Sequence, residues 1–159
     1  MINLDEIFIR VSEVKFEDRP VESDKITQLL RAAMTAPSVG NRQPWECRVV
    51  TDKEKIEGLS EIYPNAPCVK NAPVVIVPCY RTAEVRWEDT LILDLASATE
   101  NILLETGSLE LSSVWLCAAP FYDKMEKGRD SSRHFQGTSC FCTCSRRLYC
   151  ERQSVAGQI

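Results

Sequence analysis

The sequence predicts a single domain in which helices and strands are mixed, and three observations support this prediction. Apolar residues recur at helical spacing in two segments, 23–34 and 90–108, whereas residues 74–80 form a continuous apolar run of strand length. The chain has 159 residues, which is enough for one domain with a sizeable core. Tight-hairpin signals are few and only three or four strands are predicted, which argues against an all-β protein.

The composition is typical of a globular protein, with 44% hydrophobic and 26% charged residues. A net charge of −4 argues against a partner with a phosphate backbone, so we expect no nucleic acid. No apolar run approaches the roughly 18 residues of a membrane span. The first residues, MINLDEIFIR, are acidic and lack the apolar core of a signal peptide. We therefore expect a cytoplasmic protein that does not act at a membrane.

The residue pattern in the first half of the chain predicts two helices, then a strand, then a third helix. A short helix is expected over Leu4–Arg10. Ser23 is a favourable N-cap for the next helix, which Pro37 ends because proline cannot continue it. A strand is expected over residues 45–51, and Thr51 or Asp52 is placed to cap the helix that follows.

The second half predicts the central strand and the longest helix. Val74–Tyr80 lacks polar alternation, so both of its faces should be buried. The helix over 90–108 is apolar on most sides and should be nearly enclosed. A short strand is expected over Val114–Cys117, and a further helix is expected to begin within Phe121–Gly128.

The segment Ala33–Trp45, AMTAPSVGNRQPW, is the stretch richest in loop-forming and amide-bearing residues. Such a loop on rigid elements is a usual place for ligand contacts, and the alternative is a plain helix-to-strand connection. Arg10 and Ser12 carry donors suited to a phosphate group, and the alternative is a surface arginine beside a turn serine.

Four segments together resemble the nitroreductase family of flavin enzymes. IFIRVSEVKF is similar to the family's opening Arg-Arg-Ser-x-Arg-x-Phe signature, and APSVGNRQPW to its Ala-Pro-Ser-x-x-Asn-x-Gln-Pro-Trp block. NAPVVIVPC is similar to the following strand. DLASATENILLETGSLELSSVWL resembles the central helix and the Gly-Leu-Gly-x-x-Trp-Leu that follows it. The resemblance extends from about Ile7 to about Arg129, and the block around Asn41 is its most specific part.

The resemblance implies an α+β, three-layer fold with a central mixed or antiparallel sheet flanked by helices. It also implies a homodimer that holds FMN between its subunits. Family members take a hydride from NADH or NADPH onto the flavin and pass it to a nitroaromatic, a quinone or a similar small acceptor. The flavin carries this chemistry, so no side chain is assigned as catalytic and no metal is expected. The sequence leaves open the acceptor and the choice between NADH and NADPH.

The resemblance also implies which residues would bind the cofactor. Arg10 and Ser12 would contact the FMN phosphate and ribityl chain, with Val11 contributing backbone. The loop would approach the flavin of the partner subunit. The predicted cofactor-binding residues are Arg10, Val11, Ser12, Pro37, Ser38, Asn41, Gln43 and Ser112.

Several residues depart from the family pattern. Val11 and Val14 replace arginines of the opening signature, and each lost charge-assisted bond costs about 1.5–3 kcal/mol. Glu110 and Ser112 replace the glycines of Gly-Leu-Gly, where glycine permits close backbone approach to a ligand. These departures support a second hypothesis, a decayed or non-catalytic relative that holds FMN poorly.

The resemblance stops near Arg129, so we expect a nitroreductase-like domain over 1–129 and an unrelated, poorly ordered tail over 130–159. The family's C-terminal strand and arm would then be lost, although Cys140–Cys144 could supply a substitute strand. The tail cysteines Cys140, Cys142, Cys144 and Cys150 lack the paired Cys-x-x-Cys spacing of zinc sites.

A one-base frameshift near Arg129–Asp130 is our hypothesis for this tail. Cysteine codons read one base later begin with GT or GC and encode valine or alanine. Residues Asp130–Cys150 can therefore be back-translated, in the next frame, to a helix end, a strand and the Gly-Tyr that the family pattern requires. The gene's nucleotide sequence decides this question, because a frame without such an ending would exclude the hypothesis.

Overall fold

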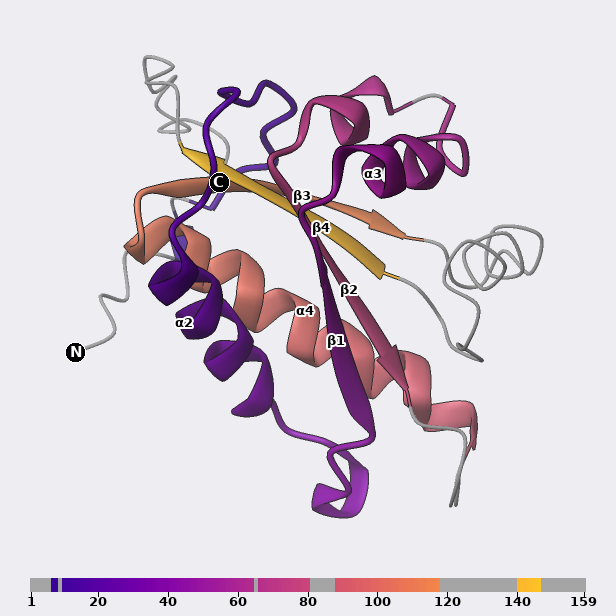
Figure 1. Ribbon diagram of the computed structural model, residues 1–159. Coiled ribbons are helices and arrows are strands. Elements are labelled where there is room, and N and C mark those ends of the chain that lie inside the picture. The colour runs from indigo at the N-terminus through magenta and orange to yellow at the C-terminus, as the bar shows by residue number, and fades with distance from the viewer. Residues whose placement is uncertain (1–6, 9, 65, 81–87, 118–139, 147–159) are drawn as a thin grey trace, which may run out of the picture.

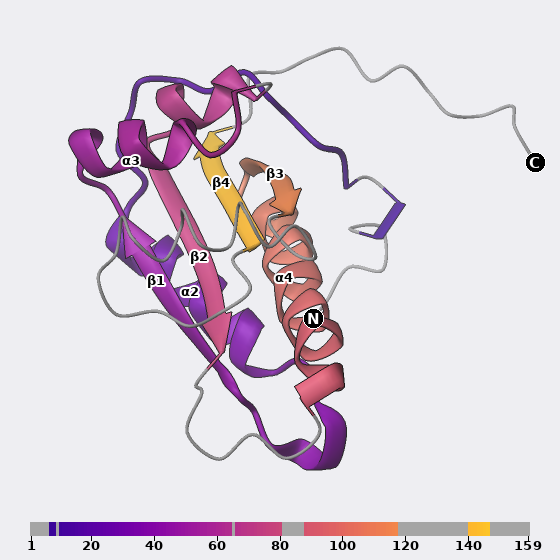
Figure 2. The same cartoon turned by 90° about the vertical axis from the view of Figure 1, so that its right-hand side faces the viewer.

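The computed structural model describes residues 7, 8, 10–64, 66–80, 88–117 and 140–146 (Figure 1). Four antiparallel strands form one sheet in the order β1-β2-β4-β3. Helices α2 and α4 cover one face, and α3 with the short 3-10 turn η2 covers the other (Figures 1 and 2). The predicted three-layer α+β fold is therefore confirmed.

The strands are β1 (Trp45–Val50), β2 (Val74–Tyr80), β3 (Leu111–Cys117) and β4 (Cys140–Arg146). The helices are α2 (Ser23–Met34), α3 (Lys53–Ser60) and α4 (Leu91–Ser108), with the 3-10 turns η1 (Val39–Asn41), η2 (Pro67–Asn71) and η3 (Glu88–Thr90).

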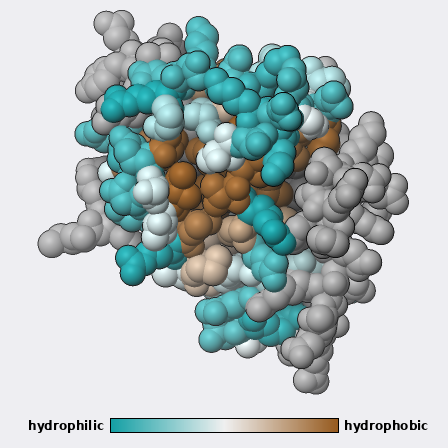
Figure 3. Space-filling view, viewed as in Figure 1, coloured by the Kyte–Doolittle hydropathy of each residue, from teal (hydrophilic) through white to brown (hydrophobic). Residues whose placement is uncertain are grey.

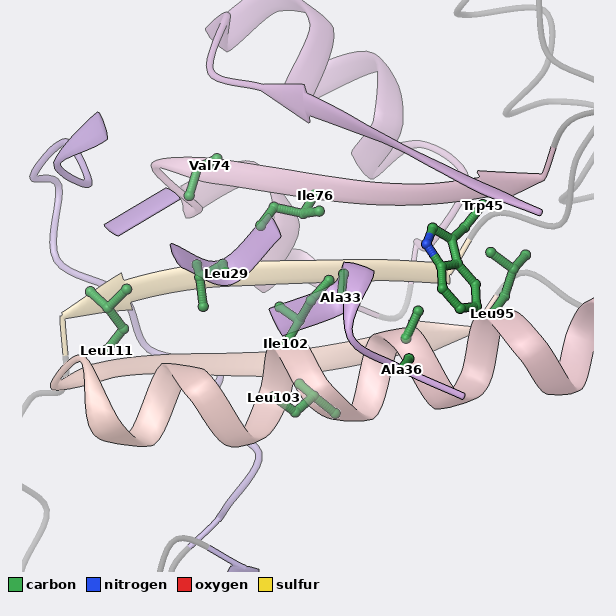
Figure 4. Close-up of a cluster of buried hydrophobic side chains, with 11 residues drawn as sticks. Leu29, Ala33, Ala36, Trp45, Val74, Ile76, Leu95, Ile102, Leu103 and Leu111 are labelled. Carbon is green, nitrogen blue, oxygen red and sulfur yellow. The ribbon is translucent and has the colours of Figure 1, made fainter. Parts of the chain in front are cut away.

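Strand β2 is buried on both faces, as the sequence predicts. Val74 and Ile76 point into the core beneath α2 and α4 (Figure 4), and Val75 and Val77 point into the core beneath α3. Pro78 is tolerated in this central strand because β4 pairs only with Val74–Ile76, so no β4 ladder bond is required at the proline nitrogen.

The predicted helix starts are partly confirmed. Asp52 caps α3, and its side chain accepts a hydrogen bond from the Lys55 amide at 3.1 Å. The prediction for Ser23 is wrong by one position, because Glu22 is the N-cap of α2 and makes no side-chain capping bond. The Ser23 carbonyl instead accepts a hydrogen bond from the Thr27 hydroxyl.

Helix α4 is enclosed along most of its length but not at its start. Leu95, Ala98 and Ile102 are fully buried in the cluster that α4 forms with the sheet and α2. Figure 4 shows Leu95 and Ile102 within this cluster. Ile92 and Leu93, one turn earlier, are 41% and 67% exposed. The sequence could not separate these two environments, because an apolar helix face has the same residue pattern whether the domain buries it or leaves it exposed.

The expected loss of the C-terminal strand is wrong, because β4 lies in the sheet between β2 and β3. It pairs with all seven residues of β3 and with three residues of β2. The alternative, a substitute strand through Cys140–Cys144, is confirmed and extends to Arg146. The arm, the 129/130 boundary and the helix predicted within Phe121–Gly128 lie outside the described residues.

The described residues contain no helix that combines the length and the apolar composition needed to cross a bilayer.

Candidate functional site

Residues 10–13 run beside β3 and close a small cavity against the end of α4. Ser12 forms an isolated parallel bridge with Ser113, and the Glu13 amide donates to the Ser113 carbonyl at 3.0 Å. The enclosed volume is about 30 Å³, enough for one water molecule. The structure therefore brings three predicted binding residues to one place, with Ser12 beside them. The lining residues are Arg10, Val11, Glu13, Leu103, Thr106, Gly107, Leu111, Ser112 and Ser113.

Arg10 is the only basic side chain that the structure shows lining this cavity. Its Nε lies 3.8 Å from Oε1 of Glu100 on α4, and both side chains are partly exposed. The Glu13 carboxylate is engaged by its own backbone, where it accepts from the amides of Val14 at 2.9 Å and Lys15 at 3.1 Å. Arg10 can thus still donate hydrogen bonds to a ligand, although Glu13 lines the same cavity and Glu100 lies beside its guanidinium.

Ser112, which replaces a glycine of the family's Gly-Leu-Gly pattern, is accommodated within β3. It is buried at the start of β3, where its neighbour Ser113 meets the Thr106 hydroxyl at 3.0 Å. Glu110 is different, because it adopts a φ of 57° directly after α4. This left-handed conformation at a helix end explains why a glycine suits the position, in addition to any contact with a ligand.

Replacing Glu110 with glycine is expected to stabilise the protein by about 1 kcal/mol, because glycine adopts positive φ without the Cβ clash. Chemical denaturation measures the change. The matched control is Glu105→Gly, the same change inside α4, which should cost about 1 kcal/mol. Equal effects at both positions would show that the positive φ carries no strain.

The loop between α2 and β1 holds the other four predicted residues, Pro37, Ser38, Asn41 and Gln43. Pro37, Asn41 and Gln43 are exposed and Ser38 is half-buried. The Ser38 carbonyl accepts from the Asn41 amide, and its hydroxyl accepts from the Gln43 amide, both at 2.9 Å. Asn41 and Gln43 have φ values of 53° and 48°. Asparagine adopts this conformation readily, but at Gln43 it costs about 1–3 kcal/mol, and such strained residues gather at functional sites.

Two residues of this region were not identified from the sequence. Asp94 of α4 is 3% exposed and accepts from the Val39 amide at 2.9 Å. The Arg42 guanidinium lies 3.4 Å from Asp94 and donates to the Thr90 hydroxyl at 2.8 Å. Their sequence separation hides the pair. The available signal was Asp94 itself, the one charged residue among the apolar residues that begin α4.

The loop lies beside the start of α4, as Figure 2 shows for η1. The cavity is lined by residues near the end of the same helix. Asp94 and Thr106 are separated by about 18 Å along the axis, given a rise of about 1.5 Å per residue. The eight predicted residues therefore form two groups in one subunit, and not a single pocket.

No cluster of metal-binding side chains is found among the described residues. Two thiols in the sheet have raised pKa values. Burial raises the pKa of the Cys47 thiol to about 11 and, together with the neighbouring Cys47, raises the pKa of Cys79 to about 12. That the protein binds no metal stays a prediction, as does the role of Cys140, Cys142, Cys144 and Cys150.

The buried Cys79 thiol is expected to make the protein less stable at high pH. The unfolded thiol loses its proton above about pH 9, whereas the folded thiol keeps it until about pH 12. Stability is therefore complete below pH 9 and falls by about 1.4 kcal/mol per pH unit above it. Urea unfolding measures the free energy of unfolding at pH 8.5 and 10.5. Between these two pH values, Cys79→Ala should lose about 2 kcal/mol less of this free energy than the unmodified protein. An identical loss in both proteins would contradict the assignment to Cys79.

Comparisons with known proteins identify the family whose motifs the sequence resembles. Residues 8–66 match the model of the nitroreductase family. A candidate NADH dehydrogenase/NAD(P)H nitroreductase of Archaeoglobus fulgidus is 37% identical over 125 residues, which are 78% of this chain and 72% of that protein.

Two solved structures have the same fold. A candidate NADH oxidase of Clostridium acetobutylicum superposes with a TM-score of 0.86 at 35% identity, covering 92% of this chain and 89% of that one. An FMN-dependent nitroreductase of Clostridium difficile superposes with a TM-score of 0.85 at 27% identity, covering 94% and 90% of the two chains.

Proposed function

Because this chain belongs to the nitroreductase family, we propose that it is an FMN-dependent oxidoreductase that transfers a hydride from NADH or NADPH to a small acceptor such as a nitroaromatic or a quinone. The observation that carries the proposal is the meeting of Arg10, Val11 and Ser112 around one cavity, with Ser12 beside it. Bound FMN would supply the two-electron carrier between the nicotinamide and the acceptor.

The residues fit the phosphate end of FMN in type and position. The partly exposed Arg10 would donate charge-assisted bonds to the phosphate, and the Ser12 hydroxyl would add a neutral donor. The cavity itself is too small for the isoalloxazine ring, so the ring would lie on the adjacent open surface. Ser112 would leave room beside the backbone of β3, because its side chain is small and buried.

We further propose that the protein acts as a homodimer, with Pro37, Ser38, Asn41 and Gln43 facing the flavin of the partner subunit. The position of this loop at the opposite end of α4 from the cavity supports that arrangement. Exposed apolar side chains near the loop also support it, because contiguous apolar surface marks association sites. These side chains are Met34, Val39, Ile92 and Leu93. Figure 3 shows an apolar area in the middle of the face that Figure 1 presents, bordered by hydrophilic residues.

The proposal is tested by titrating the purified protein with FMN and then adding NADH or NADPH without oxygen. A yellow complex whose colour is bleached by one of the two donors would support it, and sedimentation measures dimer formation on the same sample. A protein that stays colourless after FMN addition would overturn it. Comparing the two donors and a panel of nitroaromatics and quinones identifies the preferred substrates.

The second candidate is a relative that binds FMN poorly, and the charge balance of the cavity favours it. Val11 is 53% exposed and uncharged where the family pattern has arginine, and Glu100 pairs with Arg10. This candidate predicts weak FMN binding and no turnover in the same titration. A cytoplasmic location stays a prediction in either case.

A further inference from the structure

The loop between α2 and β1 contains three residues with positive φ, Gly40, Asn41 and Gln43, at 62°, 53° and 48°. Glycine and asparagine adopt this left-handed conformation readily, whereas glutamine does not. At Gln43 such a conformation persists only where surrounding structure holds it. The loop must therefore be supported by contacts that compensate for this strain.

The contacts within the loop close it but do not attach it to the rest of the domain. The Ser38 carbonyl and hydroxyl bind the amides of Asn41 and Gln43. The Arg42 Nε donates to the Val39 carbonyl at 3.0 Å. These bonds set the shape of the turn, and a second set of contacts must fix its position.

Asp94, in the first turn of α4, and Thr90 before it provide that second set. Oδ1 of Asp94 accepts from the Val39 amide at 2.9 Å, and its Oδ2 lies 3.4 Å from the Arg42 Nη2, which also donates to the Thr90 hydroxyl at 2.8 Å. The Asp94 side chain is 3% exposed and that of Arg42 is 18% exposed, so solvent competes little with either contact. One carboxylate therefore engages both the backbone and a side chain of the loop.

We propose that Asp94, together with Arg42, is a positioning residue that holds the loop in the strained form in which Ser38 and Asn41 contact the flavin ring. This inference rests on the proposed function. Asp94 acts through the loop and does not itself touch the flavin. Because the loop faces the ring and not the phosphate, loss of Asp94 weakens FMN and riboflavin binding by the same factor.

The test compares Asp94→Ala, Asp94→Asn and Asn101→Ala in the full chain. Asn101 is the matched control, because it also joins α4 to the end of α2, donating to the Ala32 carbonyl at 3.1 Å and lying 3.3 Å from the Thr35 hydroxyl. The dissociation constants of FMN and riboflavin are measured by fluorescence well below each variant's melting temperature. Trypsin cleavage after Arg42 measures the loop directly and needs no flavin.

Asp94→Ala is expected to weaken both flavins about tenfold or more and to accelerate cleavage after Arg42. Asp94→Asn should stay within about threefold of the unmodified protein, because its amide oxygen still accepts from the Val39 amide. Asn101→Ala should lower the melting temperature and leave both dissociation constants unchanged. Asp94→Asn keeps the proposal testable even if Asp94→Ala fails to fold. If Asp94→Asn weakened flavin binding about tenfold or more, the role assigned to the contact with the Val39 amide would be overturned.

Unchanged flavin affinity in Asp94→Ala would overturn the inference, and so would an equal loss in Asn101→Ala, which would indicate a general effect on stability. Unchanged trypsin cleavage in Asp94→Ala would overturn it as well. If the unmodified protein binds neither flavin while Asp94→Ala is cleaved faster, the proposed function fails and the holding of the loop by Asp94 is still supported.

Discussion

Arg10→Gln is expected to weaken FMN binding ten- to a hundredfold and to leave riboflavin binding unchanged. Arg10 is the basic side chain that the structure places at the cavity, and riboflavin lacks the phosphate that would pair with it. Charge-assisted hydrogen bonds contribute about 1.5–3 kcal/mol, and each 1.4 kcal/mol corresponds to about a tenfold change in affinity. Because Arg10 is partly exposed and also pairs with Glu100, we expect the lower part of this range.

Arg19→Gln is the matched control for this prediction. It removes the same charge from an exposed arginine outside the cavity, so both flavins should bind as they do to the unmodified protein. Fluorescence titrations of the two ligands measure the ratio of their dissociation constants. If Arg10→Gln weakens FMN and riboflavin equally, Arg10 does not bind the phosphate and the orientation proposed for FMN is wrong.

The same ratio distinguishes the working enzyme from the decayed relative. A functional phosphate site makes FMN bind much more tightly than riboflavin. In this chain Val11 contributes no charge, and Glu100 forms an ion pair with Arg10 that competes with a bound phosphate. A ratio near one in the unmodified protein would therefore favour the decayed relative.

Much of the fold was predictable because local patterns and tertiary packing agree. Val74–Tyr80 is a continuous apolar run, and it becomes the strand buried on both faces. Asp52 has the chemistry of a cap and caps α3. Ser23 also has that chemistry, yet Glu22 takes the position, because helix starts depend on backbone geometry that differs little between neighbouring residues.

The site was predictable only where residue type determines the role. The arginine and serines were identified, and the structure brings Arg10, Val11 and Ser112 together. Asp94 and Arg42 were not found, because their pairing depends on how α4 meets the loop, more than 50 residues away in sequence. Glu100 was missed for the same reason, since ion pairs between elements leave no local pattern.

The tail was the least predictable region, and Thr143→Pro tests its place in the fold. Thr143 lies in the middle of β4, opposite Val75 on one side and Val114 on the other. Proline lacks the amide donor and fits poorly in a central strand, so we expect a loss of about 3 kcal/mol or more in unfolding free energy. That is a large fraction of the about 5–15 kcal/mol typical of whole domains.

Thr143→Val, which keeps the backbone amide and a β-branched side chain at the same position, serves as the control and should have little effect. Urea unfolding and the yield of soluble protein measure both variants, because unpaired edges of β2 and β3 promote aggregation. If Thr143→Pro behaves like Thr143→Val, β4 does not occupy the centre of the sheet in solution. A frameshifted tail that does not pair stably with β2 and β3 would give that result. A strongly destabilised Thr143→Pro would instead show that the cysteine-rich sequence completes the sheet that carries the proposed flavin site.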